Sequence, residues 1–166
     1  STNFKVNFND AAIKLRNLFL DSIRLHLRSD VSLGVALSGG IDSSAITCAV
    51  RYLEPNLELK TFSYIDLDKN ISEEHWINKV NHKMNTISNK VSINIEKKLI
   101  EEFDDMIIKQ GEPFSGTSIF AQYKVFELAK KSGVKVILDG QGADELLAGY
   151  DDYVGYRIIS LVETKG

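Results

Sequence analysis

The chain has 166 residues, of which 43% are hydrophobic and 26% are charged, and its formal net charge at pH 7 is -3. This length suits one ordinary domain, and the composition is typical of a globular protein, which excludes the disordered and membrane-embedded classes. The 23 acidic and 20 basic residues are spread along the sequence, so no broad basic field is present to hold a nucleic-acid backbone.

The single cysteine and the short apolar runs indicate the setting of the protein. Cys48 alone can form neither an internal disulfide nor a thiolate metal cluster, which is typical of a reducing compartment. Its sequence neighbours are small and apolar, and we expect its side chain in the core. No apolar stretch approaches the roughly 20 residues of a membrane-spanning helix. We therefore expect a cytoplasmic protein with neither a membrane nor a nucleic acid as partner.

Helical and extended patterns alternate along the chain. Apolar residues at spacings of three and four predict helices over 12–27, 43–53, 72–84, 94–111 and 115–131. Runs rich in β-favouring residues predict strands over 33–37, 59–65, 87–93 and 134–138, with a further helix after the last one. This order predicts an α/β fold, a Rossmann-like three-layer sandwich in which a mostly parallel sheet is covered by helices on both faces.

Two of these elements carry more detailed expectations. The third strand contains the polar residues Ser88, Asn89 and Lys90, which favour a position at the edge of the sheet. In the helix before it, Trp76, Val80 and Met84 lie on one side and form one apolar stripe, and we expect Trp76 to serve in packing. Ligands of such folds bind at the carboxyl ends of the strands, where both glycine-rich turns of this chain lie.

The first glycine-rich turn begins at Ser38 and reads SGGIDSS, between an apolar strand and a helix. Gly39 and Gly40 allow backbone N–H groups to approach an anion closely, and Ser38, Ser43 and Ser44 add hydroxyl donors. The partial positive end of the following helix is directed at the same place. We interpret the turn as a cradle for the pyrophosphate of ATP. The alternative is a strand-to-helix turn in which glycine and serine serve only as caps.

Asp42 lies within this turn, and its carboxylate indicates a bound cation. A carboxylate beside bound phosphates would repel them unless a divalent cation lay between, so we interpret Asp42 as a partner of Mg²⁺. The turn lacks the Gly-Lys-Ser/Thr ending of the usual phosphate loop. Cleavage between the α and β phosphates therefore fits it better than transfer of the γ-phosphoryl group.

The second glycine-rich turn runs from Asp139 to Tyr150 and reads DGQGADELLAGY. Together the two turns resemble the signatures SGGxDS and G-E/Q-G-x-D-E-x-x-x-G-Y of asparagine synthetase-type domains, which belong to the N-type ATP pyrophosphatases, an adenine nucleotide alpha hydrolase-like superfamily. The similarity extends from Asp30 to Tyr150. It implies ATP and Mg²⁺ as cofactors and a small-molecule carboxylate and a nitrogen donor as substrates.

The resemblance also implies individual roles. It places Mg²⁺ between Asp42 and Asp144; the other interpretation of Asp144 is that it and Glu145 complement the dipole of the helix that they begin. The implied ATP and pyrophosphate site comprises Ala36, Leu37, Ser38, Gly39, Gly40, Asp42, Ser43, Ser44, Tyr64, Asp139 and Gly140.

The implied reaction is ATP-dependent amide formation. A substrate carboxylate, aspartate first among the candidates, is adenylated with release of pyrophosphate, and ammonia or an amine then attacks. The implied catalytic residues are Asp42, Asp144 and Gln141. Gln141 departs from the many asparagine synthetases that carry glutamate there, and an amide cannot act as a general base. We expect it to orient the acyl-adenylate, and the identity of the nitrogen nucleophile stays open.

Other functions remain compatible with the sequence. A related ligase that closes a ring, as β-lactam synthetases and lasso-peptide cyclases do, would use an amine within its substrate. A nucleotide-binding module without full catalytic activity would need only the Ser38 turn. Family members extend well beyond the Gly-Tyr element, so we expect this chain to be a fragment of a longer protein. Its full-length parent is expected to carry a glutaminase domain.

Overall fold

The computed structural model describes residues 7–114 and 116–165. The helices found there are α1 (Phe8–His26), α2 (Ile41–Leu53), α3 (Glu74–Met84), α4 (Ile95–Gln110), α5 (Thr117–Lys131), α6 (Ala143–Leu147) and α7 (Asp151–Lys165). The strands are β1 (Leu33–Ala36), β2 (Lys60–Tyr64), β3 (Ile87–Val91) and β4 (Val136–Leu138). Among the described helices, none combines the length and apolarity needed to cross a lipid bilayer.

The four strands form one parallel sheet in the order β3-β2-β1-β4. Val35 of β1 lies opposite Thr61 of β2 and opposite Leu138 of β4. The chain thus builds the sheet outward from β1 to β3 and then returns to place β4 on the other side of β1. The edge position predicted for β3 from its polar side chains is confirmed.

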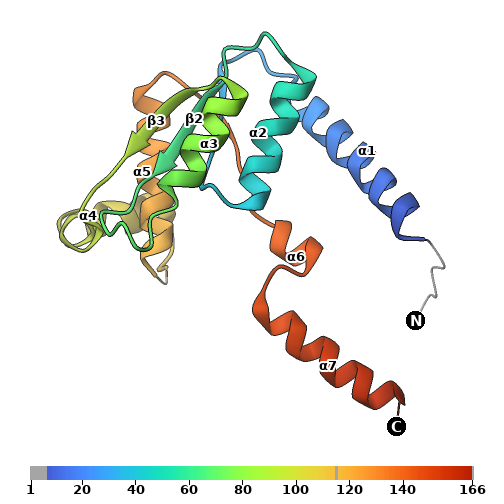
Figure 1. Cartoon of the computed structure of the whole chain (residues 1–166). Coiled ribbons are helices and arrows are strands. Elements are labelled where there is room, and N and C mark those ends of the chain that lie inside the picture. The colour runs from blue at the N-terminus through green and yellow to red at the C-terminus, as the bar shows by residue number, and fades with distance from the viewer. Residues whose placement is uncertain (1–6, 115, 166) are drawn as a thin grey trace.

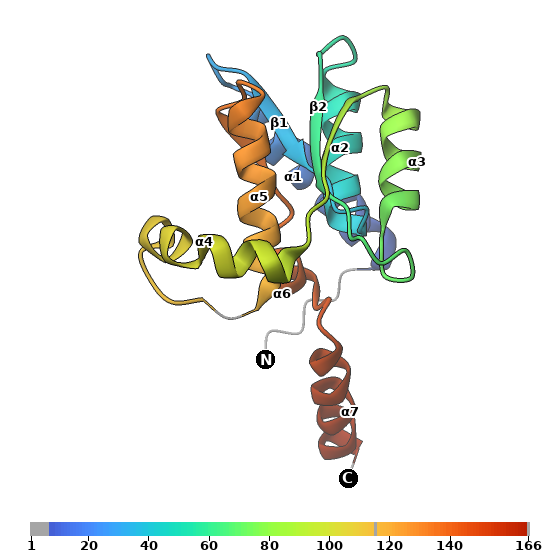
Figure 2. The same ribbon diagram turned by 90° about the vertical axis from the view of Figure 1, so that its left-hand side faces the viewer.

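Helices cover both faces of this sheet (Figure 1, Figure 2). On one face α2 and α3 lie side by side, and α1 packs against α2. On the other face α5 lies across β2 and β3, and α4 packs on α5. Helices α6 and α7 lead away from the sheet. The predicted three-layer α/β architecture is confirmed.

The alternation of side chains along the strands places apolar clusters on both faces of the sheet. Phe62 is fully buried and packs with Val125 and Ala129 of α5. Val35 and Leu59 belong to the opposite core, with α1 and α2. Because each face of the sheet is closed in this way, the open end of the strands is left for a ligand.

Two expectations about buried side chains were wrong. Trp76 is 54% exposed, and the buried residues of α3 are Ile77 and Asn81, because Asn81 turns inward to bond with the hydroxyl of Thr61. Cys48 is exposed and not in the core. The sides of α2 that meet the sheet and α1 carry its other small and apolar residues, so position 48 is left toward solvent.

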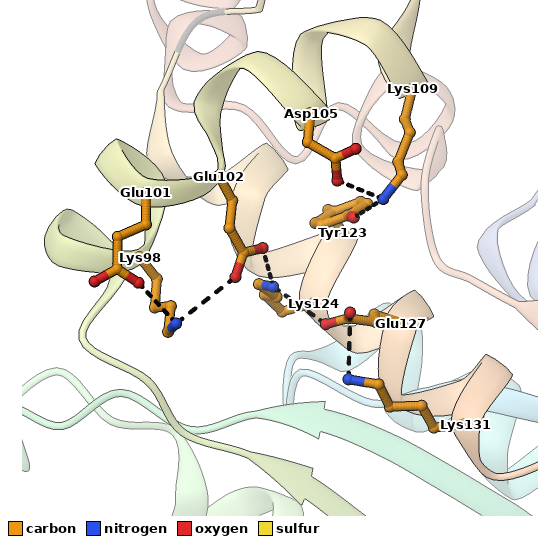
Figure 3. A network of polar contacts seen from close by, with 9 residues as sticks. All are labelled: Lys98, Glu101, Glu102, Asp105, Lys109, Tyr123, Lys124, Glu127 and Lys131. Atoms are coloured by element: carbon orange, nitrogen blue, oxygen red, sulfur yellow. Dashed lines mark hydrogen bonds and ion pairs between the residues drawn. The ribbon is translucent and has the colours of Figure 1, made fainter.

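A polar network joins α4 to α5 (Figure 3). The side chain of Lys124 is only 7% exposed and contacts the carboxylates of Glu102 on α4 and Glu127 on α5. Burial opposes the charge of Lys124, but the hydrogen bonds to both carboxylates outweigh it and raise the pKa of Lys124 above its ordinary value. The ammonium is therefore a buried ionic link between α4 and α5.

Ser63 offers a stability test within the sheet. Its hydroxyl is buried and has no hydrogen-bond partner among the described residues. Since a buried hydroxyl without a partner costs free energy, Ser63→Ala is expected to raise the free energy of unfolding by about 1 kcal/mol, measured by urea denaturation. Thr61→Val is the matched control, because it removes a hydroxyl that donates to Asn81 at 2.7 Å, and it should destabilise the protein. A loss of stability in both variants would contradict the expectation.

Candidate active site

A cavity of about 400 Å³ opens at the carboxyl ends of β1, β2 and β4. Its position coincides with the point where the strand order reverses, since β2 and β4 lie on opposite sides of β1. Open α/β sheets bind ligands at such points. The lining residues are Ala36, Leu37, Ser38, Gly40, Asp42, Ser43, Phe62, Tyr64, Glu73, Ser118, Ile119, Ala121, Gln122, Val125, Asp139, Gly140, Gln141 and Asp144.

The Ser38 turn is fixed by its own hydrogen bonds. The hydroxyl oxygens of Ser38 and Ser43 lie 3.0 Å apart, and the Ser43 hydroxyl accepts from the Ser38 backbone N–H at 3.2 Å. The N–H of Gly40 donates to the Ser38 hydroxyl at 3.2 Å. Gly39 has a φ of +93°, and a Cβ there would lie 3.2 Å from Cβ of Trp76. Both the conformation and the lack of space therefore require glycine at this position.

The second glycine-rich turn lies directly on the first. A Cβ added to Gly140 would meet Cβ of Asp42 at 3.2 Å and the backbone nitrogen of Ser43 at 3.3 Å. The two motifs, about 100 residues apart in sequence, thus form one surface at the start of α2. Because α2 is a full helix of 13 residues, its partial positive end also contributes to this surface.

Asp42 and Asp144 both line the cavity, one from each motif. The described residues include no group of three or more His, Cys, Asp or Glu side chains able to hold a metal ion by themselves. Magnesium that is shared with nucleotide phosphates needs only one or two carboxylates, the remaining ligands being phosphate oxygens and water. The donor set therefore fits Mg²⁺ bound together with a nucleotide.

Tyr64 forms the wall of the cavity at the end of β2. Its hydroxyl donates to the carbonyl of Ile93 at 3.3 Å. Burial, with a smaller contribution from the charge of Asp66, raises the pKa of Tyr64 above its ordinary value. The ring therefore stays neutral at physiological pH and offers an apolar face with a fixed polar end.

The residues predicted for the nucleotide site mostly meet in this cavity. Ala36, Leu37, Ser38, Gly40, Asp42, Ser43, Tyr64, Asp139 and Gly140 line it, together with Gln141 and Asp144. Gly39 and Ser44 are not among the lining residues. Gly39 lies against α3, and the backbone N–H of Ser44 donates to the carbonyl of Gly40 within α2.

The sequence did not indicate the part of the cavity formed by α5. Ser118, Ile119, Ala121 and Gln122 line it from the first turns of that helix. The amide of Gln122 donates to the carboxylate of Asp139 at 2.8 Å, so α5 holds the side chain that follows β4. A polar residue one turn before the buried Val125 was the available signal, because the inner side of a covering helix is otherwise apolar.

Gln122→Leu tests this contact. Asp139 would lose its donor inside the cavity, and we expect the affinity for ATP to fall about fivefold, which corresponds to one hydrogen bond of about 1 kcal/mol. Isothermal titration calorimetry with ATP and Mg²⁺ measures the change. Gln110→Leu, at the exposed end of α4, is the matched control and should leave the affinity unchanged. Equal affinities of the two variants would show that the Gln122 contact does not support the nucleotide site.

Comparisons with known proteins identify the family of the chain. A family model described as asparagine synthase matches residues 14–160. The chain is 35% identical to the glutamine-hydrolyzing asparagine synthetase 1 of Bacillus subtilis, over 92% of this chain and 24% of that protein. It is 28% identical to the glutamine-hydrolyzing asparagine synthetase B of Escherichia coli, over 82% of this chain and 27% of that protein. The chain thus spans about a quarter of the length of these relatives.

A solved structure supports the fold. The NH3-dependent NAD synthetase of Campylobacter jejuni, in complex with a nitrate ion, aligns with a TM-score of 0.50 and 19% sequence identity, over 87% of this chain and 61% of that one. This likeness concerns the parallel sheet and its covering helices. The family model, in contrast, covers most of the sequence and both glycine-rich motifs. The chain therefore belongs to the asparagine synthase family.

Proposed function

We propose that this chain is the ATP-binding part of a ligase that adenylates a substrate carboxylate and releases pyrophosphate. The observation that carries the proposal is the contact between the two glycine-rich motifs, where Gly140 lies on Asp42 and Ser43. Asp42 and Asp144 line the one cavity that these motifs share. Such a surface suits a nucleotide whose α and β phosphates are to be separated.

The chain's own groups would act mainly through charge. The backbone N–H groups at the start of α2, and those of the Ser38 turn that are not bonded to serine hydroxyls, would stabilise the negative charge that grows as pyrophosphate departs. Asp42 and Asp144 would hold Mg²⁺, which supplies positive charge to the phosphates when bound. Because these groups are already placed in the folded chain, little reorganisation accompanies the reaction.

The nucleoside would lie deeper in the cavity. Ala36 and Tyr64 present backbone and an apolar ring at the ends of β1 and β2. Asp139, held by Gln122, presents a carboxylate oriented by a hydrogen bond, which suits the hydroxyls of a ribose. In this arrangement the adenine contacts apolar surface while the sugar and the phosphates extend toward the loops.

Gln141 would face the activated acyl group. It lines the cavity and is exposed, directly after Gly140 in the turn that touches Asp42. Its amide can donate to the acyl oxygen and accept from an incoming amine, but it cannot take up a proton. We propose that it orients the acyl-adenylate, and that the nucleophile or another group supplies the base.

Aspartate is the proposed carboxylate, because the relatives are named asparagine synthetases. Those relatives are also named as glutamine-hydrolyzing, so we propose that a glutaminase domain of the full-length protein delivers ammonia. The lone cysteine supports a cytoplasmic setting. The ring-closing alternative differs in one point, namely that the amine would come from the substrate that is adenylated.

Isotope exchange between ATP and pyrophosphate tests the proposal on the full-length protein. Aspartate and Mg²⁺ should support exchange, and ammonia should convert the intermediate to asparagine. Exchange that requires a different acid, with no response to aspartate, would exclude asparagine synthesis but retain adenylation. Turnover of an amine-bearing acid without ammonia would favour ring closure. Absence of ATP binding in calorimetry would exclude both ligases and the nucleotide-binding module.

A further inference from the structure

At the end of α6, the glycine, Gly149, lies one residue after the position where helix ends usually carry it. Ala148 adopts the left-handed conformation, with φ 57° and ψ 46°, and the N–H of Gly149 donates to the carbonyl of Asp144 at 3.0 Å. This is the pattern of a Schellman helix end, in which glycine usually takes the left-handed position. Here alanine takes it, although an L-residue pays a conformational cost there, and the glycine comes one residue later.

The backbone of Gly149 does not explain this placement. Its φ lies outside the left-handed region, so any residue could adopt its conformation. Space explains it instead. A Cβ at position 149 would lie 2.0 Å from Oδ1 of Asp144 and 3.0 Å from Cγ of the same side chain. The Asp144 carboxylate therefore occupies the volume that any other residue at position 149 would fill.

The neighbouring acid is fixed separately. The hydroxyl of Tyr150 donates to Oε1 of Glu145 at 2.8 Å, which holds Glu145 on the exposed side of α6. Asp144 alone of the two lines the cavity. The two residues of the Gly-Tyr pair that follows α6 thus act on different carboxylates. Gly149 leaves room for the carboxylate of Asp144, and Tyr150 binds that of Glu145.

We propose that Gly149 is a positioning residue for Asp144. By leaving its side-chain volume empty, it allows the Asp144 carboxylate to take the orientation in which it lines the cavity. An alanine there would force the short carboxylate to turn away, while the backbone at Asp144, with its Cα 3.3 Å from the added Cβ, would need to shift only slightly. The consequence for nucleotide binding rests on the proposed role of Asp144 toward Mg²⁺.

Gly149→Ala and the adjacent Ala148→Gly separate space from backbone conformation. Gly149→Ala should weaken ATP binding about tenfold in the presence of Mg²⁺, leave binding in EDTA unchanged, and shift Tm by less than about 2 °C. Ala148→Gly removes the left-handed alanine, so it should raise Tm by about 2 °C and leave the affinity for ATP unchanged. Calorimetry and thermal denaturation of the full-length variants give both readouts.

Two further measurements distinguish a failure of the metal role of Asp144 from a failure of the positioning role of Gly149. Asp144→Ala sets the scale of the metal effect: if it keeps the wild-type difference between ATP binding with Mg²⁺ and with EDTA, the proposed metal role fails. If Asp144→Ala shows the loss and Gly149→Ala does not, the positioning role is overturned. Equal losses with Mg²⁺ and EDTA in Gly149→Ala would reduce Gly149 to a structural residue. A crystal structure of Gly149→Ala with the Asp144 carboxylate unmoved overturns the inference irrespective of ligand binding.

Discussion

Asp42→Asn is expected to lower the rate of pyrophosphate release by about 100-fold, the usual scale for removing one preorganised electrostatic group from an active site. The amide keeps the shape of the side chain but loses the charge that would hold Mg²⁺ against the phosphates. The folded structure should persist, because Asp42 is only half-buried in the first turn of α2 and its charge contributes at most about 1 kcal/mol there. Isotope exchange at saturating ATP measures the effect.

Asp10→Asn is the matched control for this variant. Asp10 also lies in the first turn of a helix, α1, but it does not line the cavity. The substitution therefore reproduces the loss of charge at a helix start without touching the site. Equal rates of pyrophosphate release in Asp42→Asn and Asp10→Asn would remove Asp42 from the proposed chemistry.

Lys124→Met is expected to lower the free energy of unfolding by about 2 kcal/mol. Removing the ammonium leaves Glu102 and Glu127 partly buried without the cation between them (Figure 3). The effect is smaller than for a fully buried pair, because Lys98 and Lys131 also contact these carboxylates from the exposed side. Urea denaturation at pH 7 measures the loss.

Lys109→Met provides the comparison on the same pair of helices. Lys109 contacts Asp105 and the hydroxyl of Tyr123, but its side chain is 54% exposed. Exposed pairs contribute at most about 1 kcal/mol, so this variant should lose clearly less stability than Lys124→Met. Losses of similar size would indicate that burial of Lys124 does not decide its contribution.

The pH dependence gives a second check. Burial favours protonation of Glu127, but hydrogen bonds from Lys124 and Lys131 outweigh it and place the pKa of Glu127 below its ordinary value of 4.5. A depressed pKa stabilises the fold above the ordinary value, and the contribution is lost as pH falls through the folded-state pKa. The pKa of Lys124 is raised, so its contribution is present below 10.5 and is lost only at higher pH. The difference between wild type and Lys124→Met should therefore be constant from about pH 5 to 9 and shrink in acid.

The sequence was most informative where the chemistry is local. The Ser38 turn follows an apolar strand and begins a helix, and glycine at position 39 is needed by the backbone itself, so the motif could be recognised without the fold. The alternation of strands and helices then predicted that this turn and the one at Asp139 lie at the same end of the sheet.

The features that the sequence did not predict are determined by contacts between distant segments of the chain. Asn81 points inward because Thr61 offers its hydroxyl from another element, a pairing that the spacing of apolar residues in α3 does not reveal. Gln122 joins the cavity because its amide reaches the carboxylate of Asp139, which follows β4 in another segment of the chain. The role of Gly149 depends on where one oxygen of Asp144 lies. Such features follow from distances between segments, which a periodic pattern does not contain.

The order of the sheet has a consequence for how the protein acquires its ligand. Pairing of β1 with β4 sets Gly34 beside Ile137, which closes a loop of about 100 residues around β2 and β3. Closing so long a loop is entropically costly and slow compared with local pairing. Only after this closure does the Asp139 turn reach Asp42 and Ser43. A chain that has formed β1 to β3 alone would possess half of the proposed nucleotide site, so a nucleotide bound there would stabilise molecules that have completed folding against reopening.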